Sequence, residues 1–281
     1  MTNTVAEDSD YRNAMIDAVC YWMGYQFKIG REQLIHEASL RYPVADTITS
    51  KGVGMERIVL EQLHPLFKSK KIDLVVFAEN TSKTDIETND AKLREVFEFK
   101  LAKSRTGEKH SDEHQRVFDD LARLAYYNHW GGKDCYFLMC GTYEDFKSYF
   151  VGQGNKPITD GEKNKVQIKP TSPIPTDELQ ATQWKPEGIY KNWFGFRTGE
   201  TKEITFKNND DSFGLKPFQN SYHIRDTEKH IYQDTINIST TCITITPAGL
   251  ENIRTHAAGI WKIKTIHSTI PLTSEFEQFE I

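Results

Sequence analysis

One segment of the chain, Arg94–Leu101 (REVFEFKL), constrains the fold most because it alternates charged with large apolar residues. Alternation with a period of two is typical of a β-strand with one polar and one apolar face. On such a strand Glu98 and Lys100 project to one side, and the intervening Phe99 projects to the other. The segment therefore predicts a strand that carries two opposite charges side by side on one face of a sheet.

The segments around this strand predict an α/β fold. Short apolar or β-branched runs predict further strands at Ile72–Phe77 and Cys135–Gly141. Apolar residues at helical spacing predict helices over Ser9–Tyr25, Arg31–Tyr42, Met55–Phe67, Asp112–Asn128 and Tyr143–Phe150. Pro43 is expected to end the second of these helices, because proline disfavours helix in the residue before it.

A proline-rich stretch divides the chain into two predicted parts. Prolines gather between residues 157 and 186, which is typical of an extended connection. Residues 1–152 are therefore expected to form a helical N-terminal segment and an α/β core, and residues 153–281 an α+β extension or second domain. In this second part strands are expected near 204–206, 221–224 and 237–246, with a helix near Ala248–Ala258.

Composition and charge exclude several classes of protein. The net charge of −5 and the 38% of hydrophobic residues are ordinary for a globular protein, not for a disordered or fibrous one. The four cysteines form no Cys-x-x-Cys pair and predict neither a zinc site nor a disulfide framework. The polar, acidic start and the short apolar run at 135–140 predict no export signal and no membrane span, so a cytoplasmic protein is expected.

Two carboxylates are predicted to face each other across neighbouring strands. If Ile72–Phe77 pairs with Arg94–Leu101, Asp73 can stand across from Glu98. Facing carboxylates form an oxygen site suited to Mg²⁺, which takes carboxylates, waters and a substrate phosphate as ligands. Lys100 is then placed to hold or polarise an attacking water. These groups suffice for metal-assisted phosphodiester hydrolysis, and the alternative is ordinary cross-strand ion pairing on a sheet face.

At these residues the chain resembles the PD-(D/E)xK nucleases, the restriction-endonuclease-like superfamily. The resemblance is carried by a helix, Asp73, the triplet Glu98-Phe99-Lys100, the following helix and the next strand, over about residues 54–150. It implies a restriction-endonuclease-like core in which helices flank a mixed sheet. It also implies that Asp73 and Glu98 bind the metal together with the Phe99 carbonyl, and that Lys100 acts on the nucleophilic water.

Further residues are candidates for the same site. Such folds often add a glutamate from the helix before the first strand, and Glu56 is preferred to Glu61 because it lies nearer the apolar stripe of the predicted helix. Glu37 is a third choice. The basic loop after the strand offers phosphate contacts through Lys103, Arg105 and Lys109. Accessory candidates on the next helix are His114, Arg116 and Arg123.

The resemblance implies a divalent-metal-dependent endonuclease that hydrolyses DNA, with Mg²⁺ or Mn²⁺ as cofactor, in prokaryotic restriction or anti-phage defence. DNA is the expected partner, with a homodimer needed to cut both strands at once, or a defence-system protein for targeting. Two alternatives stay open. The fold can serve as a non-catalytic nucleic-acid-binding or assembly subunit, or the same chemistry can act on RNA, because these residues do not identify the sugar.

Overall fold

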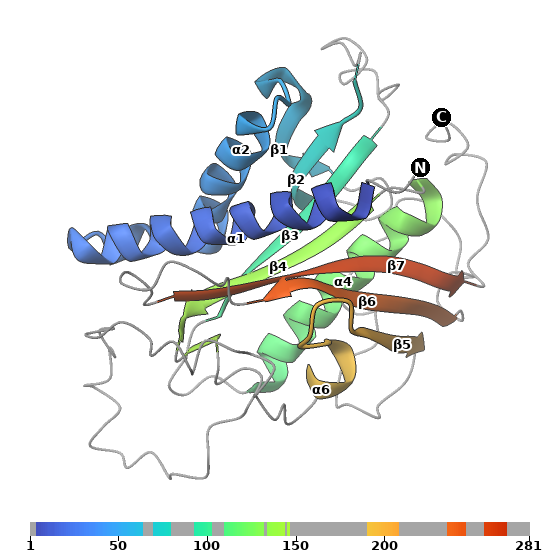
Figure 1. The fold of residues 1–281 in the computed structure, drawn as a ribbon. Coiled ribbons are helices and arrows are strands. Elements are labelled where there is room, and N and C mark those ends of the chain that lie inside the picture. The colour runs from blue at the N-terminus through green and yellow to red at the C-terminus, as the bar shows by residue number, and fades with distance from the viewer. Residues whose placement is uncertain are drawn as a thin grey trace, which may run out of the picture.

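A single mixed sheet with helices on both sides forms the centre of the molecule (Figure 1). The structure is a computed structural model that describes residues 4–63, 70–79, 93–102, 110–131, 134–143, 145–146, 190–207, 235–245 and 256–268. Within these residues the sheet has seven strands in the order β1-β2-β3-β4-β7-β6-β5. Helices cover both faces, so the prediction of an α/β fold with a mixed, helix-flanked sheet is confirmed at this level.

The strand directions follow from the connections. The strands are β1 (Ile58–Leu63), β2 (Lys71–Phe77), β3 (Leu93–Ala102), β4 (Asp134–Thr142), β5 (Thr201–Lys207), β6 (Thr235–Ile245) and β7 (His256–Ser268). The only parallel pair among them is β3 with β4, and it is joined through helix α4 (His110–Gly131). Parallel neighbours need such a crossover, and α4 packs against β3, β4 and β7.

The sheet separates the apolar core into two layers, each covered by helices. On one face, α1 (Thr4–Lys28) and α2 (Arg41–Ser50) pack on a cluster that includes Phe97, Phe99 and Leu101. On the other face, α4 and the short α6 (Tyr190–Trp193) cover a cluster that includes Val96 and Ala102. The alternation along β3 therefore divides as its sequence predicts, and Glu98 and Lys100 share the α4 face.

The helix predicted for Arg31–Tyr42 is wrong. Two 3-10 turns, Glu32–Leu34 and Glu37–Leu40, occupy this segment, and α2 begins only at Arg41. The Ser39 hydroxyl bonds to the backbone of His36 in both directions, a local arrangement that competes with an α-helix. Pro43 then lies in the first turn of α2, where its missing N–H costs no hydrogen bond, so this proline starts a helix and does not end one.

The helix predicted for Met55–Phe67 is also wrong over Met55–Leu63, and residues 64–67 lie outside the described ones. Residues Met55–Arg57 form one 3-10 turn, and Ile58–Leu63 form β1, which pairs with β2. Arg57 is buried and donates two hydrogen bonds to the carbonyl of Phe77, at 2.8 and 3.0 Å, which fixes the start of the strand. The partner strand decides the conformation here, because an edge strand has too few buried residues to show a clear period of two.

The other predicted elements of the first part largely agree with the structure. The predicted strands at 72–77, 94–101 and 135–141 and the helices at 9–25 and 112–128 are confirmed, with slightly longer bounds. Of the helix predicted over 143–150, Tyr143, Asp145 and Phe146 are helical, and the remaining residues lie outside the described ones.

Strands from the second part of the sequence continue the same sheet. β7 pairs with β4, and β6 and β5 follow outward, so strands from before and after the proline-rich stretch hydrogen-bond in one sheet. The strands predicted near 204 and 237 are confirmed. The helix predicted to reach Ala258 is wrong over its last three residues, where β7 has begun. The proline-rich stretch and the strand predicted at 221–224 lie outside the described residues.

None of the helices in the described part of the chain is both long enough and apolar enough to cross a membrane.

Candidate functional site

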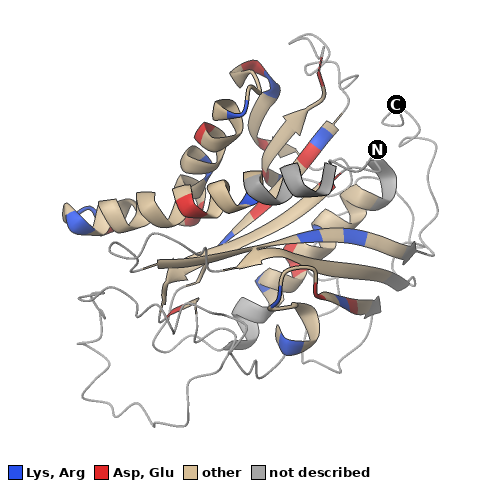
Figure 2. Ribbon diagram, in the orientation of Figure 1, with Lys and Arg blue, Asp and Glu red and all other residues tan. Residues whose placement is uncertain are grey.

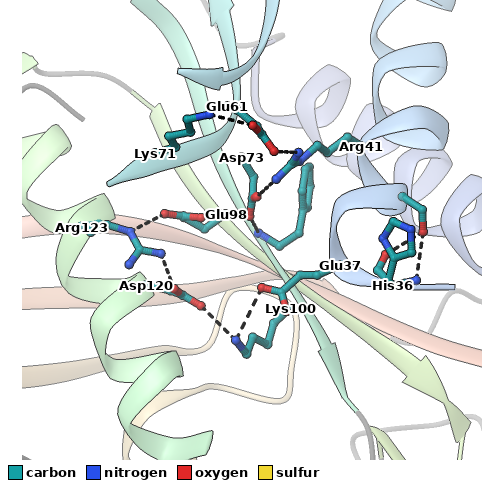
Figure 3. Close-up of polar contacts among 12 residues, drawn as sticks. His36, Glu37, Arg41, Glu61, Lys71, Asp73, Glu98, Lys100, Asp120 and Arg123 are labelled. Atoms are coloured by element: carbon teal, nitrogen blue, oxygen red, sulfur yellow. Dashed lines mark hydrogen bonds and ion pairs between the residues drawn. The ribbon is translucent and has the colours of Figure 1, made fainter. Parts of the chain in front are cut away.

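Asp73 and Glu98 lie where the pairing of β2 and β3 ends. Leu74 is opposite Phe97 in the antiparallel register, so one further step along both strands brings Asp73 opposite Glu98. The backbones no longer pair at that step. The Asp73 Oδ2 instead accepts a hydrogen bond of 2.9 Å from the N–H of Phe99 (Figure 3). The side chain of Asp73 thus satisfies a backbone donor at the point where the two strands separate.

Glu98 is bound by an arginine from the helix above it. Its Oε1 accepts a hydrogen bond of 2.7 Å from Nε of Arg123 on α4. The Nη2 of the same guanidinium donates to Asp120, one turn earlier on the helix. The Glu98 side chain is 3% exposed, so this pairing takes place almost without water.

Lys100 reaches two carboxylates from different elements. Its Nζ lies 3.6 Å from Oδ2 of Asp120 on α4 and 3.5 Å from Oε1 of Glu37 on the 3-10 turn before α2. The Lys100 side chain is 6% exposed. Figure 2 shows how closely acidic and basic residues lie along β3, the strand that carries both Glu98 and Lys100.

Asp73 has an arginine of its own. The Nη2 of Arg41, the first residue of α2, donates to Asp73 Oδ1 at 2.6 Å, and the Nη1 donates to Oε1 of Glu61 at 2.7 Å. Glu61 also accepts from Lys71 at 2.9 Å. These contacts form two networks, one of Lys71, Glu61, Arg41 and Asp73 and the other of Glu98, Arg123, Asp120, Lys100 and Glu37 (Figure 3). The networks meet where the charge of Asp73 acts on Glu98, and we call all nine residues the charged cluster.

Carboxylates outnumber basic groups in the charged cluster. Its five carboxylates and four basic groups leave a net charge of −1 when all of them are ionised. Burial raises the pKa of Glu98 well above its ordinary value, and the charges of Asp73 and Asp120 raise it further against the opposing effect of Arg123. At the exposed end, hydrogen bonds from Lys71 and Arg41 lower the pKa of Glu61 to about 2.

Part of this cluster was not predicted from the sequence. Arg41, Lys71 and Asp120 were not candidates, whereas Arg123 was an accessory one and Glu37 and Glu61 were alternatives. For Asp120 a signal exists in the sequence, because it interrupts the apolar face of a helix between Val117, Leu121 and Leu124, all fully buried. Arg41 carries no such signal, since its position depends on where α2 begins.

Other predicted residues lie away from the charged cluster. Glu56 is exposed, and its carboxylate folds back against Gly54, where an added Cβ would clash with Oε1. Within the described residues no hydrogen bond or ion pair joins Glu56 to the cluster. Arg116 is exposed on α4. Phe99 borders the cluster, where its N–H bonds to Asp73, and the role of its carbonyl as a metal ligand stays a prediction. The basic loop with Lys103, Arg105 and Lys109 lies outside the described residues, as does the side chain of His114.

The described residues contain no preformed metal centre. Among the described residues, no group of three or more His, Cys, Asp or Glu side chains is arranged to hold a metal ion. No family model, curated protein or solved structure matches the chain.

Proposed function

We propose that the chain is a divalent-metal-dependent endonuclease that hydrolyses DNA phosphodiester bonds, with Asp73, Glu98 and Lys100 at its centre. One observation carries this proposal. Asp73 and Glu98 occupy facing positions at the step where β2 and β3 separate, and Lys100 follows on the same face as Glu98. Such a pair offers carboxylate oxygens from two rigid strands at one opening of the sheet.

The donor set suits Mg²⁺ or Mn²⁺. Asp73 and Glu98 would hold the ion, since hard divalent cations prefer carboxylate oxygens, and the net negative charge of the charged cluster favours its entry. When bound, the ion would lower the pKa of a water and stabilise charge on the phosphate. Lys100, restrained by Glu37 and Asp120, would orient that water through an ammonium donor.

The arrangement of elements supports the same proposal. Three antiparallel strands, a crossover helix and a strand parallel to the third follow one another from β1 to β4. They lie in the region, about residues 54–150, on which the resemblance to PD-(D/E)xK nucleases rests, although the helix expected there before Asp73 is strand β1. The restriction-endonuclease-like core belongs to the proposal. A role in restriction or anti-phage defence, and a homodimer that cuts both strands, are its further parts.

A cleavage assay with matched variants tests the proposal. Supercoiled plasmid, linear duplex, single-stranded DNA and RNA are incubated with the purified chain in Mg²⁺, Mn²⁺ or EDTA. We expect metal-dependent cutting of DNA that is lost in Glu98→Gln and in Lys100→Met and retained in Glu203→Gln, an exposed change on β5. Cutting of RNA alone would redirect the substrate, and cutting retained by both site variants would refute the assignment.

A specific observation supports a second candidate function. Both facing carboxylates are already paired with an arginine, Asp73 with Arg41 and Glu98 with Arg123. Such pairing is what a non-catalytic nucleic-acid-binding or assembly subunit would use to stabilise the same fold. Calorimetry distinguishes the two functions, because the second predicts no Mg²⁺ or Mn²⁺ binding that depends on Asp73 and Glu98.

A further inference from the structure

Arg41 is held between two carboxylates that differ in their surroundings. Its Nη1 donates to Glu61, whose side chain is 46% exposed, and its Nη2 donates to Asp73, whose side chain is 14% exposed. Lys71, which also contacts Glu61, is 51% exposed. The guanidinium therefore lies at the border between the solvent-exposed end of the charged cluster and its buried centre (Figure 3).

Glu61 has an unusual backbone conformation that places it as the outer anchor. Within the described part of the chain it is the one non-glycine residue with a positive φ, 56°. A left-handed residue other than glycine carries a strain of about 1 kcal/mol, and it persists where surrounding contacts compensate for it. At Glu61 these contacts are the ion pairs with Arg41 and Lys71. Glu61 thus holds Nη1 of Arg41 through a bond that does not involve Asp73.

The guanidinium has further donors on the edge that faces Asp73. Nε of Arg41 is buried and makes no hydrogen bond among the described residues, and it shares one edge of the planar group with Nη2. Release of Nη2 from Asp73 leaves two neighbouring N–H donors in the geometry that binds phosphate oxygens in pairs. The bond from Nη1 to Glu61 is on the other side and need not break.

From these contacts we infer that Arg41 is a substrate-binding switch, which neutralises Asp73 in the metal-free protein and transfers to a phosphate oxygen of the nucleic acid when Asp73 accepts the divalent cation. This rests on the proposed function. Asp73 cannot bind both cations closely without repulsion between them, so the ion and Arg41 compete for it. Once Arg41 is released, the site has gained positive charge and attracts the phosphodiester backbone.

The switch predicts opposite effects of one substitution on two affinities. Arg41→Gln removes the competing cation, so Mn²⁺ binds more tightly by about tenfold, and it removes a phosphate contact, so duplex DNA binds more weakly by about tenfold. Arg41→Lys keeps the charge but loses the paired donors, so Mn²⁺ affinity stays near that of the wild type while duplex affinity falls. A residue that only supports the fold would not move the two affinities in opposite directions.

The experiment measures both affinities without cleavage. Mn²⁺ binding is followed by calorimetry, and binding of a fluorescent duplex is followed by anisotropy at saturating Mn²⁺. All variants are made in a Lys100→Met background, which keeps the proposed ligands. Arg197→Gln, an exposed change between α6 and β5, is the matched control. Thermal unfolding shows that each variant is folded, and if Arg41→Gln is not, Arg41→Lys carries the test through its loss of duplex affinity alone.

Each outcome separates the switch from the proposed function. Mn²⁺ binding gained in Arg41→Gln supports the switch, even where the parent shows none. Equal Mn²⁺ affinity in parent and Arg41→Gln overturns the switch and leaves the metal site standing, as does unchanged duplex affinity. Weaker Mn²⁺ binding in Arg41→Gln also overturns it, because Arg41 would then support the site. If neither the parent nor Arg41→Gln binds Mn²⁺, the metal site and the switch are refuted together.

Discussion

Arg123→Met should destabilise the metal-free protein because it leaves a buried carboxylate without a counter-ion. Arg123 is the residue of α4 that bonds both Glu98 and Asp120. Asp120 keeps Lys100 nearby after the substitution, whereas Glu98 loses the only ion pair that joins it to a described residue. The methionine retains most of the apolar stem of the arginine, so the change acts mainly on charge.

The loss of stability in Arg123→Met has an upper limit that depends on pH. Breaking a buried ion pair by removal of one partner costs about 3 to 5 kcal/mol. Arg123 is the charge that lowers the raised pKa of Glu98, so its loss raises that pKa further and lets the folded variant protonate Glu98; taking up that proton at pH 7 costs about 3.4 kcal/mol relative to the ordinary pKa of 4.5. At pH 5 the same step costs about 0.7 kcal/mol. The folded state then binds one more proton than the unfolded state, so the variant loses stability as the pH rises.

Urea unfolding at pH 5 and pH 7 measures this difference. We expect Arg123→Met to lose about 3 kcal/mol at pH 7 and less than about 1 kcal/mol at pH 5. Adding Glu98→Gln should restore most of the loss at pH 7, and Arg116→Met, at an exposed position on the same helix, should have little effect. If the loss of stability is equal at both pH values, or if Glu98→Gln does not relieve it, then loss of the counter-ion of Glu98 is not its cause.

The remaining predictions concern stability. Burial lowers the pKa of His256 to about 4, so the unfolded state takes up the proton first as the pH falls from about 6.5. The free energy of unfolding should therefore decrease by up to about 3 kcal/mol by pH 4. Equal pH slopes in wild type and His256→Gln would contradict this. Arg12 is 1% exposed and lies 3.0 Å from Glu95, so Arg12→Met should lower the free energy of unfolding by about 3 to 5 kcal/mol. Urea unfolding should show that Glu95→Gln in the double variant relieves this loss. Asp73→Ala should cost about 1 to 3 kcal/mol because the Phe99 N–H loses its acceptor, whereas Asp73→Asn keeps an oxygen there and should cost less; equal thermal unfolding of the two variants would argue against the hydrogen bond.

The centre of the site was predictable because it depends on local alternation. Glu98 and Lys100 share a face by the period of a strand, whatever the rest of the fold, and Phe99 between them packs on the opposite face in the structure. Their burial under a helix also follows, since the strand is joined by α4 to a parallel neighbour. The facing position of Asp73 needed one additional assumption, that β2 pairs with β3, and the register agrees with it.

The partners of these residues were not predictable because they depend on tertiary contacts. Arg41 reaches Asp73 only because α2 begins at that residue, and the sequence instead favoured a helix that ended near there. Glu61 reaches Arg41 because Ile58–Leu63 is an edge strand with a left-handed residue, while its apolar spacing favoured a helix. In both segments weak local preferences were overridden by pairing and packing, which a single sequence does not reveal.

The two oxygens of Asp73 divide its structural role from its proposed chemical one. Oδ2 accepts a hydrogen bond from the N–H of Phe99 and so stabilises the place where β2 and β3 separate, whereas Oδ1 accepts one from the side chain of Arg41. A carboxylate oxygen has more than one lone pair, so Asp73 can exchange Arg41 for a divalent cation at Oδ1 while Oδ2 keeps its backbone donor. The strands then need not move when the cation binds. The site would be fixed in the metal-free protein, and only the side chain of Arg41 would have to change its position.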